Sequence, residues 1–378
     1  MRVGIIGAGV SGLVCAQRLL SLADGTLSVS VFEWGRGPGG RTARRRVTLK
    51  DGSEVSFDHA APFFTAKSTE FQQMLSEWEA SGHAAQWSDS PEPTYVGTPS
   101  NHAICRLLAE KVTGSPGGCM LYGRHVRTAR HDAAAGEWIV CATNRGDKSD
   151  EEHRFDALVF SDKLLLLPNP YAVLPAADWG PLALPSTLAS TGAVVLMLAL
   201  ERSYDTPIRP ILTAAHAPLK MLVHDSAKPG RHTTVAAGST LDLWTAHSTP
   251  EYALAHLVGD DPPGMDDEEL VLGEMTAAAL ATLAASVDHA EQSCTTKSEN
   301  EPIGKPGPSV AFSSVMMWDH AQPAAESRLP TSHLLDASRR AGVCGDFFAG
   351  PEEKHSGIEA AALSGKALAD ALMSVLEK

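Results

Sequence analysis

Two glycine-rich turns within the first 42 residues constrain this chain more than any other feature of its sequence. The first, in RVGIIGAGVSGLVCAQRLL, places Gly7, Gly9 and Gly12 in the spacing G-x-G-x-x-G between two apolar segments. This spacing predicts a strand, a tight turn and a helix, with Gly9 leaving room for a pyrophosphate at the backbone. We therefore expect a Rossmann-type dinucleotide site, with Val10 and Ser11 opening the helix whose N–H groups face the phosphates.

An acidic residue follows where such a site needs one. SVSVF predicts the second strand, and Glu33 at its end lies 21 residues beyond Gly12. A carboxylate at that position accepts hydrogen bonds from a ribose diol and repels a 2′-phosphate. We also assign Trp34, which comes next, and Val126, in a later strand, to the cofactor site.

The second turn, GRGPGGRT, indicates a cofactor longer than a simple nucleotide. Pro38 and four glycines prevent the helix that would follow Glu33 in a plain NAD-binding domain. The loop therefore places the backbone of Gly39 and Gly40, with Arg41, beside a ligand that continues past the adenosine. FAD has such a tail, so noncovalent FAD is the predicted cofactor, and no metal site is assigned.

The C-terminal segment AGVCGDFF…SGIEAAALSG completes the predicted site. Its strand delivers Asp346, which can bond a ribityl hydroxyl or the pyrophosphate side. Ser356 and Glu359 form S-x-x-E, a capping box that predicts a helix from about Gly357. The positive end of this helix would stabilise negative charge on a reduced flavin. The cofactor-binding residues assigned here are Gly345, Asp346, Gly357 and Ile358.

Together these motifs resemble the glutathione-reductase-type FAD fold of flavin amine oxidases, and the middle of the chain is similar to renalase-like members. FDHAAPFFTAKSTEF, YVGTPSNHAICRLLAE and LDLWTAHSTPEYA carry this second resemblance, in the family's order. It implies an FAD-dependent oxidase in which a hydride moves from a dihydronicotinamide-like substrate to flavin N5, and oxygen accepts the electrons. The family's Gln-Tyr is Pro62-Phe63 here, and Ala360 and Ala362 stand where relatives have Gly and Trp.

Side chains for the substrate face are less defined, because a flavin supplies most of the chemistry of hydride transfer. We assign Phe63, Phe64, Trp318 and His320 to the catalytic face, and Trp244 is a further aromatic candidate. Two alternatives stay open. One is an amine oxidase or desaturase of a bulkier apolar substrate, and the other is an FAD-binding protein without catalysis.

The expected fold class is α/β, with a Rossmann-type FAD-binding domain and a second α+β substrate domain on a mainly antiparallel sheet. The FAD domain is predicted to be discontinuous, comprising residues 1–67, 100–165 and 336–378. Residues 68–99 and 166–335 are predicted to form the substrate domain. RRRVTLKDGSEVSF predicts a hairpin, STEFQQMLSEWEASG a helix capped by Ser68 or Thr69, and residues 119–162 a β-meander whose last strand returns to the central sheet.

Charge and apolar patterning exclude several other classes. A net charge of −14 argues against a nucleic-acid partner or an anionic membrane surface. The apolar runs are too short for an expected membrane span, and six scattered cysteines suit reduced thiols. We expect a cytoplasmic protein whose partners are a small-molecule substrate and molecular oxygen.

Overall fold

The central sheet of the computed structural model joins strands from both ends of the chain. The structure describes residues 1–378 except 88–92, 202–207, 215–216, 232–233, 237–238, 259–263, 266, 294–307 and 351–356. The sheet is parallel apart from its edge strand β20, which confirms the predicted Rossmann-type sheet. Its order is β20 (Leu334–Asp336), β21 (Ala341–Val343), β11 (Ala157–Phe160), β1 (Arg2–Ile6), β2 (Ser28–Glu33) and β7 (Gly118–Tyr122).

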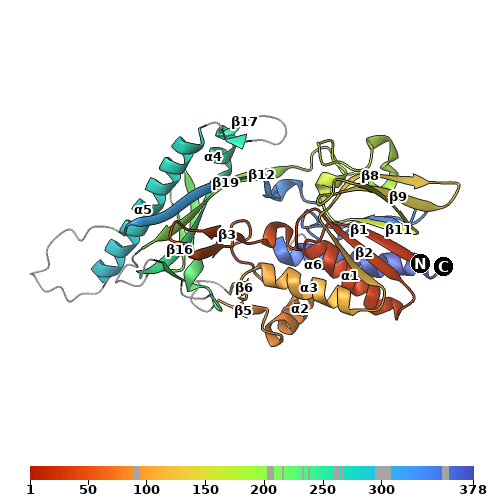
Figure 1. The fold of residues 1–378 in the computed structure, drawn as a ribbon, viewed down its shortest axis with the longest axis horizontal. Coiled ribbons are helices and arrows are strands. Elements are labelled where there is room, and N and C mark those ends of the chain that lie inside the picture. Colours follow the sequence, from red (N-terminus) through yellow and green to blue (C-terminus); the bar gives the residue numbers. More distant parts are fainter. Residues whose placement is uncertain are drawn as a thin grey trace, which may run out of the picture.

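Four helices pack on one side of this sheet around a shared apolar core (Figure 1). They are α1 (Val10–Ala23), α2 (Thr69–Ala80), α3 (His102–Gly114) and α6 (Gly357–Leu376). The contact between α1 and α6 is close, since a Cβ on Gly365 would lie 2.2 Å from the carbonyl oxygen of Ser11. Helix α2 begins after Ser68, whose hydroxyl accepts from Phe71 N at 3.3 Å, so Ser68 is the N-cap.

A three-stranded antiparallel sheet covers the other side of the central sheet. It consists of β8 (Arg124–Asp132), β9 (Glu137–Asn144) and β10 (Asp150–Phe155), packed through a second core. The predicted meander is wrong at its first strand, because β7 pairs in parallel with β2 in the central sheet. Its last strand does return there, as β11 beside β1.

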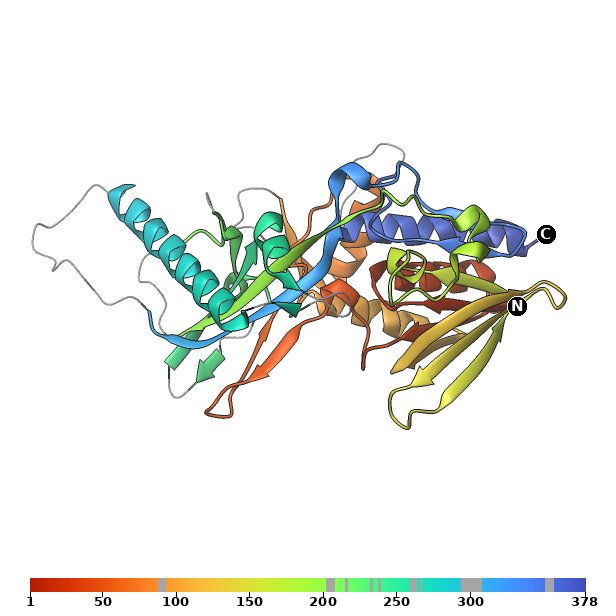
Figure 2. The same cartoon turned by 90° about the horizontal axis from the view of Figure 1, so that it is seen from above.

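A second large sheet is antiparallel, as predicted. Its strands are β13 (Ile211–Thr213), β14 (Leu219–His224), β16 (Ser239–Ser248), β12 (Ser190–Leu200) and β19 (Val310–Pro323), in that order, and β15 (Thr234–Ala236) pairs with β16. In Figure 2 the long strands β12 and β19 run side by side from beside α5 (Glu268–Ser293) toward the C-terminal helix α6. One face packs against α5, and the predicted hairpin, β3 (Arg45–Thr48) with β4 (Glu54–Phe57), covers the other.

The remaining elements are short. They are β5 (Ala84–Gln86) with β6 (Tyr95–Gly97), α4 (Pro250–Ala255), and β17 (Leu257–Val258) with β18 (Gly264–Met265). By length and composition, one stretch of the described residues, Glu268–Val287 in α5, could cross a membrane. Only 22% of that stretch is buried, and its buried residues, among them Val271, Met275 and Leu283, pack against the second sheet.

The domain limits stay a prediction, and packing departs from them at two segments. Phe71 and Trp78, placed with the substrate domain, lie in the core between the central sheet and its helices. Leu166 and Leu182 lie in the core between the central sheet and the β8–β10 sheet. Apolar packing thus joins parts of both segments to the central sheet.

Candidate functional site

The glycines of the first turn serve two different purposes. Gly7 has a φ of +106°, and a Cβ on Gly12 would lie 2.1 Å from the oxygen of Gly7, so the turn itself requires both. Gly9 has an ordinary φ of −79°, and nothing in the described part of the chain lies within 4 Å of where its Cβ would be. The open space beside Gly9, at the positive end of α1, therefore suits a phosphate.

The carboxylate of Glu33 is held at the end of β2 by two backbone donors. Ala8 N donates to one oxygen at 3.1 Å, and Gly35 N donates to the other at 2.6 Å. Burial raises the pKa of Glu33, and these two donors partly offset that effect. The fixed carboxylate keeps lone pairs for ribose hydroxyl donors.

Trp34 and Val126 lie around the same end of the central sheet. The Trp34 ring, 48% exposed, stacks on His125 with centroids 4.4 Å apart. Val126, the next residue of β8, is buried. The structure thus brings both assigned residues near the carboxyl end of β2.

The second glycine-rich turn lies directly against the first. Gly39 N donates to the oxygen of Ala8 at 2.9 Å, and a Cβ on Gly40 would lie 3.5 Å from the Cα of Gly9. Gly39 and Gly40 have φ values of +148° and +52°, which favour glycine. The two turns form one continuous backbone surface.

Arg41 connects this surface to the C-terminal segment and to the second sheet. Its guanidinium donates two hydrogen bonds to Asp346, at 2.6 and 2.7 Å, and its Nη1 lies 3.5 Å from the carbonyl of Ala321 in β19. Burial lowers the pKa of Arg41, but the Asp346 carboxylate more than offsets this and raises it. Gly345 N, beside Asp346, donates to Ser364 Oγ at 3.0 Å, which fixes this segment on α6.

Helix α6 begins at Gly357, as predicted, with Ile358 buried behind it. Ser356, one half of the predicted capping box, lies outside the described residues. Glu359 is 1% exposed and accepts from the backbone N–H and the hydroxyl of Ser68, at 2.8 and 2.7 Å. Glu359 therefore links the start of α2 to the first turn of α6.

The aromatic residues assigned to the catalytic face do not form one group. Phe63 and Trp87, which follows β5, pack in one cluster with Val223 of the second sheet, whereas Phe64 lies in the core between the central sheet and its helices. Trp244 points to the α5 side of the second sheet, where its Nε1 donates to Asp242 at 3.1 Å. Of the four assigned residues, Trp318 and His320 are on β19, close to Ala321, which Arg41 reaches.

Four charged side chains that we did not predict join the segment after β4 to the segment after β14 of the second sheet. Lys228 bonds Asp58, with Nζ and oxygen 3.2 Å apart, and also bonds Asp225, while Arg231 bonds Asp58. The side chains of Lys228, Asp58 and Asp225 are at most 1% exposed. Asn101 N donates to Asp58 at 3.2 Å, so this neutral quartet anchors the segment that follows β4.

The second sheet has a polar face on the side away from α5. Thr245 and His247 of β16 and Trp318 of β19 all pair with alternate residues of β12, which places the three side chains on one face. Trp244, which lies between them in sequence, packs toward α5. We call Thr245, His247 and Trp318 the polar face. His59 lies over it, with its ring centroid 5.3 Å from that of Trp318.

Buried polar atoms without a hydrogen-bond partner gather at this face. Leaving such an atom unpaired costs about 1–3 kcal/mol, so several together call for a ligand or ordered water. The alternation in LWTAHS, with Thr245 and His247 two residues apart, was the sequence signal we did not use. In the described part of the chain these atoms are His59 Nδ1, Trp87 Nε1, Thr245 Oγ1, His247 Nε2, Trp318 Nε1 and His320 Nδ1, with Thr276 Oγ1 on α5.

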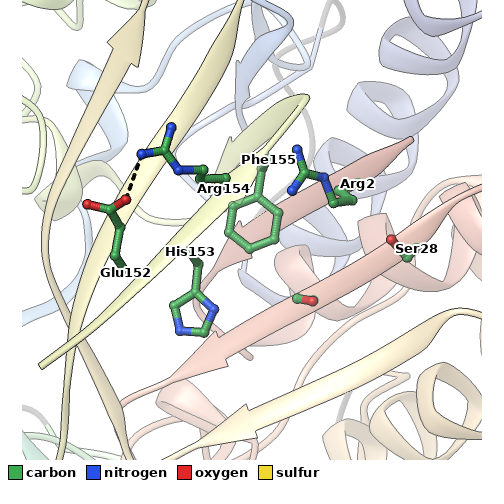
Figure 3. Close-up of a pocket in the computed structure, with 7 residues that line it drawn as sticks. Arg2, Ser28, Glu152, His153, Arg154 and Phe155 are labelled. Atoms are coloured by element: carbon green, nitrogen blue, oxygen red, sulfur yellow. Dashed lines mark hydrogen bonds and ion pairs between the residues drawn. The ribbon is translucent and has the colours of Figure 1, made fainter. Parts of the chain in front are cut away.

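A separate cavity of about 430 Å³ opens at the other end of the central sheet. Figure 3 shows Arg2 and Ser28 at the starts of β1 and β2, facing Glu152, His153 and Arg154 of β10. Its arginines are already paired, Arg2 with Glu137 at 2.5 Å and Arg154 with Glu152 at 2.9 Å. This cavity lies away from the glycine-rich turns, because strands β1 and β2 run from it toward them.

A family model and one solved structure support the Rossmann-like fold of this chain. Residues 5–78 match the model of an NAD(P)-binding Rossmann-like domain. A solved oxidoreductase from Methanosarcina mazei aligns over 100% of both chains, with a TM-score of 0.56 and 14% identity. A flavoprotein/dehydrogenase from Cytophaga hutchinsonii aligns over 99% of this chain and 79% of its own, with a TM-score of 0.46 and 12% identity. The Methanosarcina structure shares the fold of this chain.

The buried histidines predict how stability depends on pH. Burial and nearby Lys228 lower the pKa of His247 to about 3, and burial with nearby Arg45 lowers that of His59 to about 4. Below an unfolded pKa near 6.5, the unfolded chain binds protons that the native state does not, so stability falls as the pH falls toward 4. We expect His247→Gln to reduce this slope by up to about 1.4 kcal/mol per pH unit below pH 6.5.

Urea unfolding of the wild type and His247→Gln at a series of pH values measures this difference. Above neutral pH the two slopes are expected to coincide, which serves as the internal control. Equal slopes between pH 6 and 4 would show that His247 is protonated in the native state.

Proposed function

We propose that this protein is an FAD-dependent oxidase that takes a hydride from a small reduced substrate, with oxygen as the acceptor. One observation carries the proposal: a continuous path of contacts runs from Ala8, beside Gly9, through Gly39 and then Arg41 to Ala321 on β19. This path begins at the open space beside Gly9 and ends three residues from Trp318, which is on the polar face. It suits a dinucleotide that reaches from the Rossmann-like sheet to the second sheet.

The residues along the path fit FAD in type and position. Glu33 would bind the ribose, the space beside Gly9 would receive the pyrophosphate, and Asp346 with Arg41 would lie along the ribityl chain. When bound, FAD would supply the electron-accepting ring. The chain's own residues would exclude water from it with the buried segment at His59 and would position the substrate with Trp318.

The resemblance to renalase-like proteins and the paired charges of the Asp58–Lys228 quartet favour a dihydronicotinamide-like substrate over an amine. Asp58 and Asp225 are already paired with Lys228 and Arg231, so neither carboxylate is available to bind an ammonium group. Lys228, for its part, is held by these two acids. An amine beside the quartet would therefore find neither of these two carboxylates free as a counter-charge, which is unfavourable.

Anaerobic stopped-flow reduction of the flavin tests the proposed reaction. Dihydronicotinamide isomers whose hydride is on a different ring carbon from that of NADH should bleach the flavin fastest, NADH more slowly, and benzylamine hardly at all. The physical reason is geometric, because a stacked ring brings only some carbons within about 3–3.5 Å of the accepting atom. Reduction by amines or polyenes alone would instead support the alternative oxidases, and reduction by no donor would support a non-catalytic flavin protein.

Glu33→Ala should weaken FAD retention, because ribose hydroxyls would lose a fixed acceptor. We expect about a 10-fold rise in Kd, roughly 1.4 kcal/mol, measured by fluorescence titration of the cofactor-free protein. Glu110→Ala, which removes only an exposed partner of Arg106 on α3, is the control and should leave the Kd unchanged. An unchanged Kd in Glu33→Ala would move the ribose site elsewhere.

A further inference from the structure

A run of arginines follows the second glycine-rich turn in a chain that is acidic overall. The net charge is −14, yet residues 36–46 contain five arginines and no acidic residue. Arg41 is paired with Asp346, whereas Arg44 and Arg46 form no ion pair within the part of the chain that the structure describes. The positive charge is therefore concentrated in one place, directly after the second glycine-rich turn.

The segment that carries these arginines packs on the first turns of α3. Thr42 Oγ1 lies 3.2 Å from Cys105 Sγ, so the chain enters β3 beside this helix. Arg106 comes directly after Cys105, and His102 lies one turn before Arg106 on the same helix. Arg44, two residues after Thr42, is partly buried at this contact.

Electrostatic effects show that these cations lie close to one another. Burial lowers the pKa of Arg44, and the charges of Arg46 and Arg106 lower it further. Burial lowers the pKa of His102 as well; a bond to the Pro38 carbonyl partly offsets this, and the same three guanidiniums lower it again. We call Arg44, Arg46 and Arg106 the arginine cluster. Its members repel one another, so an anion bound among them would be stabilising.

The acids beside the arginine cluster compensate it poorly. Glu110 pairs with Arg106 at 3.4 Å, but the two side chains are 61% and 59% exposed, and an ion pair so open to water contributes little. Asp58, whose charge also acts on Arg44, is already bonded to Lys228 within the buried quartet. The cluster therefore keeps an excess of positive charge that an external anion could neutralise.

The chemistry of the cluster favours phosphate oxygens. A guanidinium presents its N–H donors as a planar fork that matches phosphate geometry, and several forks around one point suit a group with more than one negative charge. We propose that Arg44, Arg46 and Arg106, with His102 beside them, bind a diphosphate group. None of the four belongs to the path from Gly9 to β19, so this is a second site, and it requires neither a flavin nor turnover.

Calorimetric titration of the full chain with inorganic pyrophosphate tests the site. The chain is first loaded with FAD and freed of unbound cofactor, so that the glycine-rich turns are occupied. Pyrophosphate should bind at least about 10-fold more tightly than succinate, and Arg44→Gln and Arg46→Gln should each weaken pyrophosphate binding by about 10-fold. Arg130→Gln is the matched control and should change nothing, because Arg130 is an exposed arginine of β8 that has no ion pair among the described residues.

ADP, titrated in the same way, identifies the source of the diphosphate. Binding of ADP as tight as that of pyrophosphate, or tighter, indicates a nucleotide, and weaker binding indicates a free diphosphate. Both results support the site provided that Arg44→Gln weakens the tighter of the two ligands.

Glu110→Ala gives a readout that misfolding cannot imitate. It removes the acid beside Arg106 and should therefore strengthen pyrophosphate binding by about 3-fold. Equal affinity for succinate and pyrophosphate, binding that neither Arg44→Gln nor Arg46→Gln changes, or no binding of pyrophosphate would each overturn the inference.

Gly9→Ala, studied without cofactor, separates this site from the proposed cofactor site. Pyrophosphate should still bind to this variant, and loss of binding would place the anion at the glycine-rich turns and overturn the inference. Pyrophosphate binding through the arginine cluster in a chain that does not bind FAD would contradict the proposed oxidase and leave the inference standing.

Discussion

Gly9→Ala is expected to abolish tight FAD binding in a protein that remains folded, whereas Gly12→Ala is expected to destabilise the fold itself. The same methyl group meets different surroundings at the two positions. At Gly9 it enters open space at the start of α1, where a pyrophosphate would lie, while at Gly12 it would come within 2.1 Å of the Gly7 oxygen. We expect Gly9→Ala to raise the FAD Kd by about 100-fold, or 2.7 kcal/mol, and Gly12→Ala to cost about 3 kcal/mol of stability.

Urea unfolding of the cofactor-free variants, together with FAD titration, separates these two effects. The unfolding midpoint of Gly9→Ala should stay close to that of the wild type, because its φ of −79° suits alanine. If Gly9→Ala bound FAD normally, the phosphate would not lie beside Gly9. If Gly12→Ala were as stable as the wild type, the contact with Gly7 would be relaxed at little cost.

The glycine-rich turns illustrate which parts of the site could be predicted. The positions of Gly7, Gly12 and Glu33 follow from local backbone requirements, so their spacing alone predicted the strand, turn and helix that the structure has. The meeting of Arg41 with Asp346 could be expected only in outline, because the two residues are 305 positions apart. The parallel pairing of β7 with β2 was missed, since a short apolar strand looks the same in a meander and in a central sheet.

Lys228→Met should be the most destabilising single change at the contact between the hairpin segment and the second sheet. It leaves Asp58 and Asp225 buried with Arg231 as their remaining cation, and Asp225 loses its ion-pair partner. Removing one member of a buried ion pair typically costs about 3–5 kcal/mol. Burial already raises the pKa of Asp58, so loss of Lys228 should raise it further.

Chemical denaturation near neutral pH measures this cost, and a double variant identifies its cause. Adding Asp225→Asn to Lys228→Met should recover part of the lost stability, since it removes the uncompensated charge. Arg106→Met, which breaks an exposed pair with Glu110, is the control and should change stability by no more than about 0.5 kcal/mol. A Lys228→Met protein as stable as the wild type would show that water reaches these acids.

The quartet, and the meeting of Trp318 and His59 with Thr245 and His247, could not be predicted from the sequence for a related reason. Asp58 and Lys228 are 170 positions apart, and nothing in either local segment specifies the other. Phe63 and Phe64, adjacent in sequence, were both assigned to the substrate face, but consecutive extended residues point to opposite sides, and Phe64 entered the α1–α3 core. His59 became notable only through its unpaired ring nitrogen Nδ1, which is a property of the folded chain.

The identity of the bound cofactor tests the central claim most directly. The purified full chain, reconstituted with a mixture of FAD, FMN and NAD and then freed of unbound ligand, is denatured, and the released molecule is identified by mass spectrometry and absorbance. A continuous site from Gly9 to β19 predicts FAD, released intact by denaturation and bound at one molecule per chain. Recovery of NAD or FMN in its place, or of no flavin at all, would contradict it.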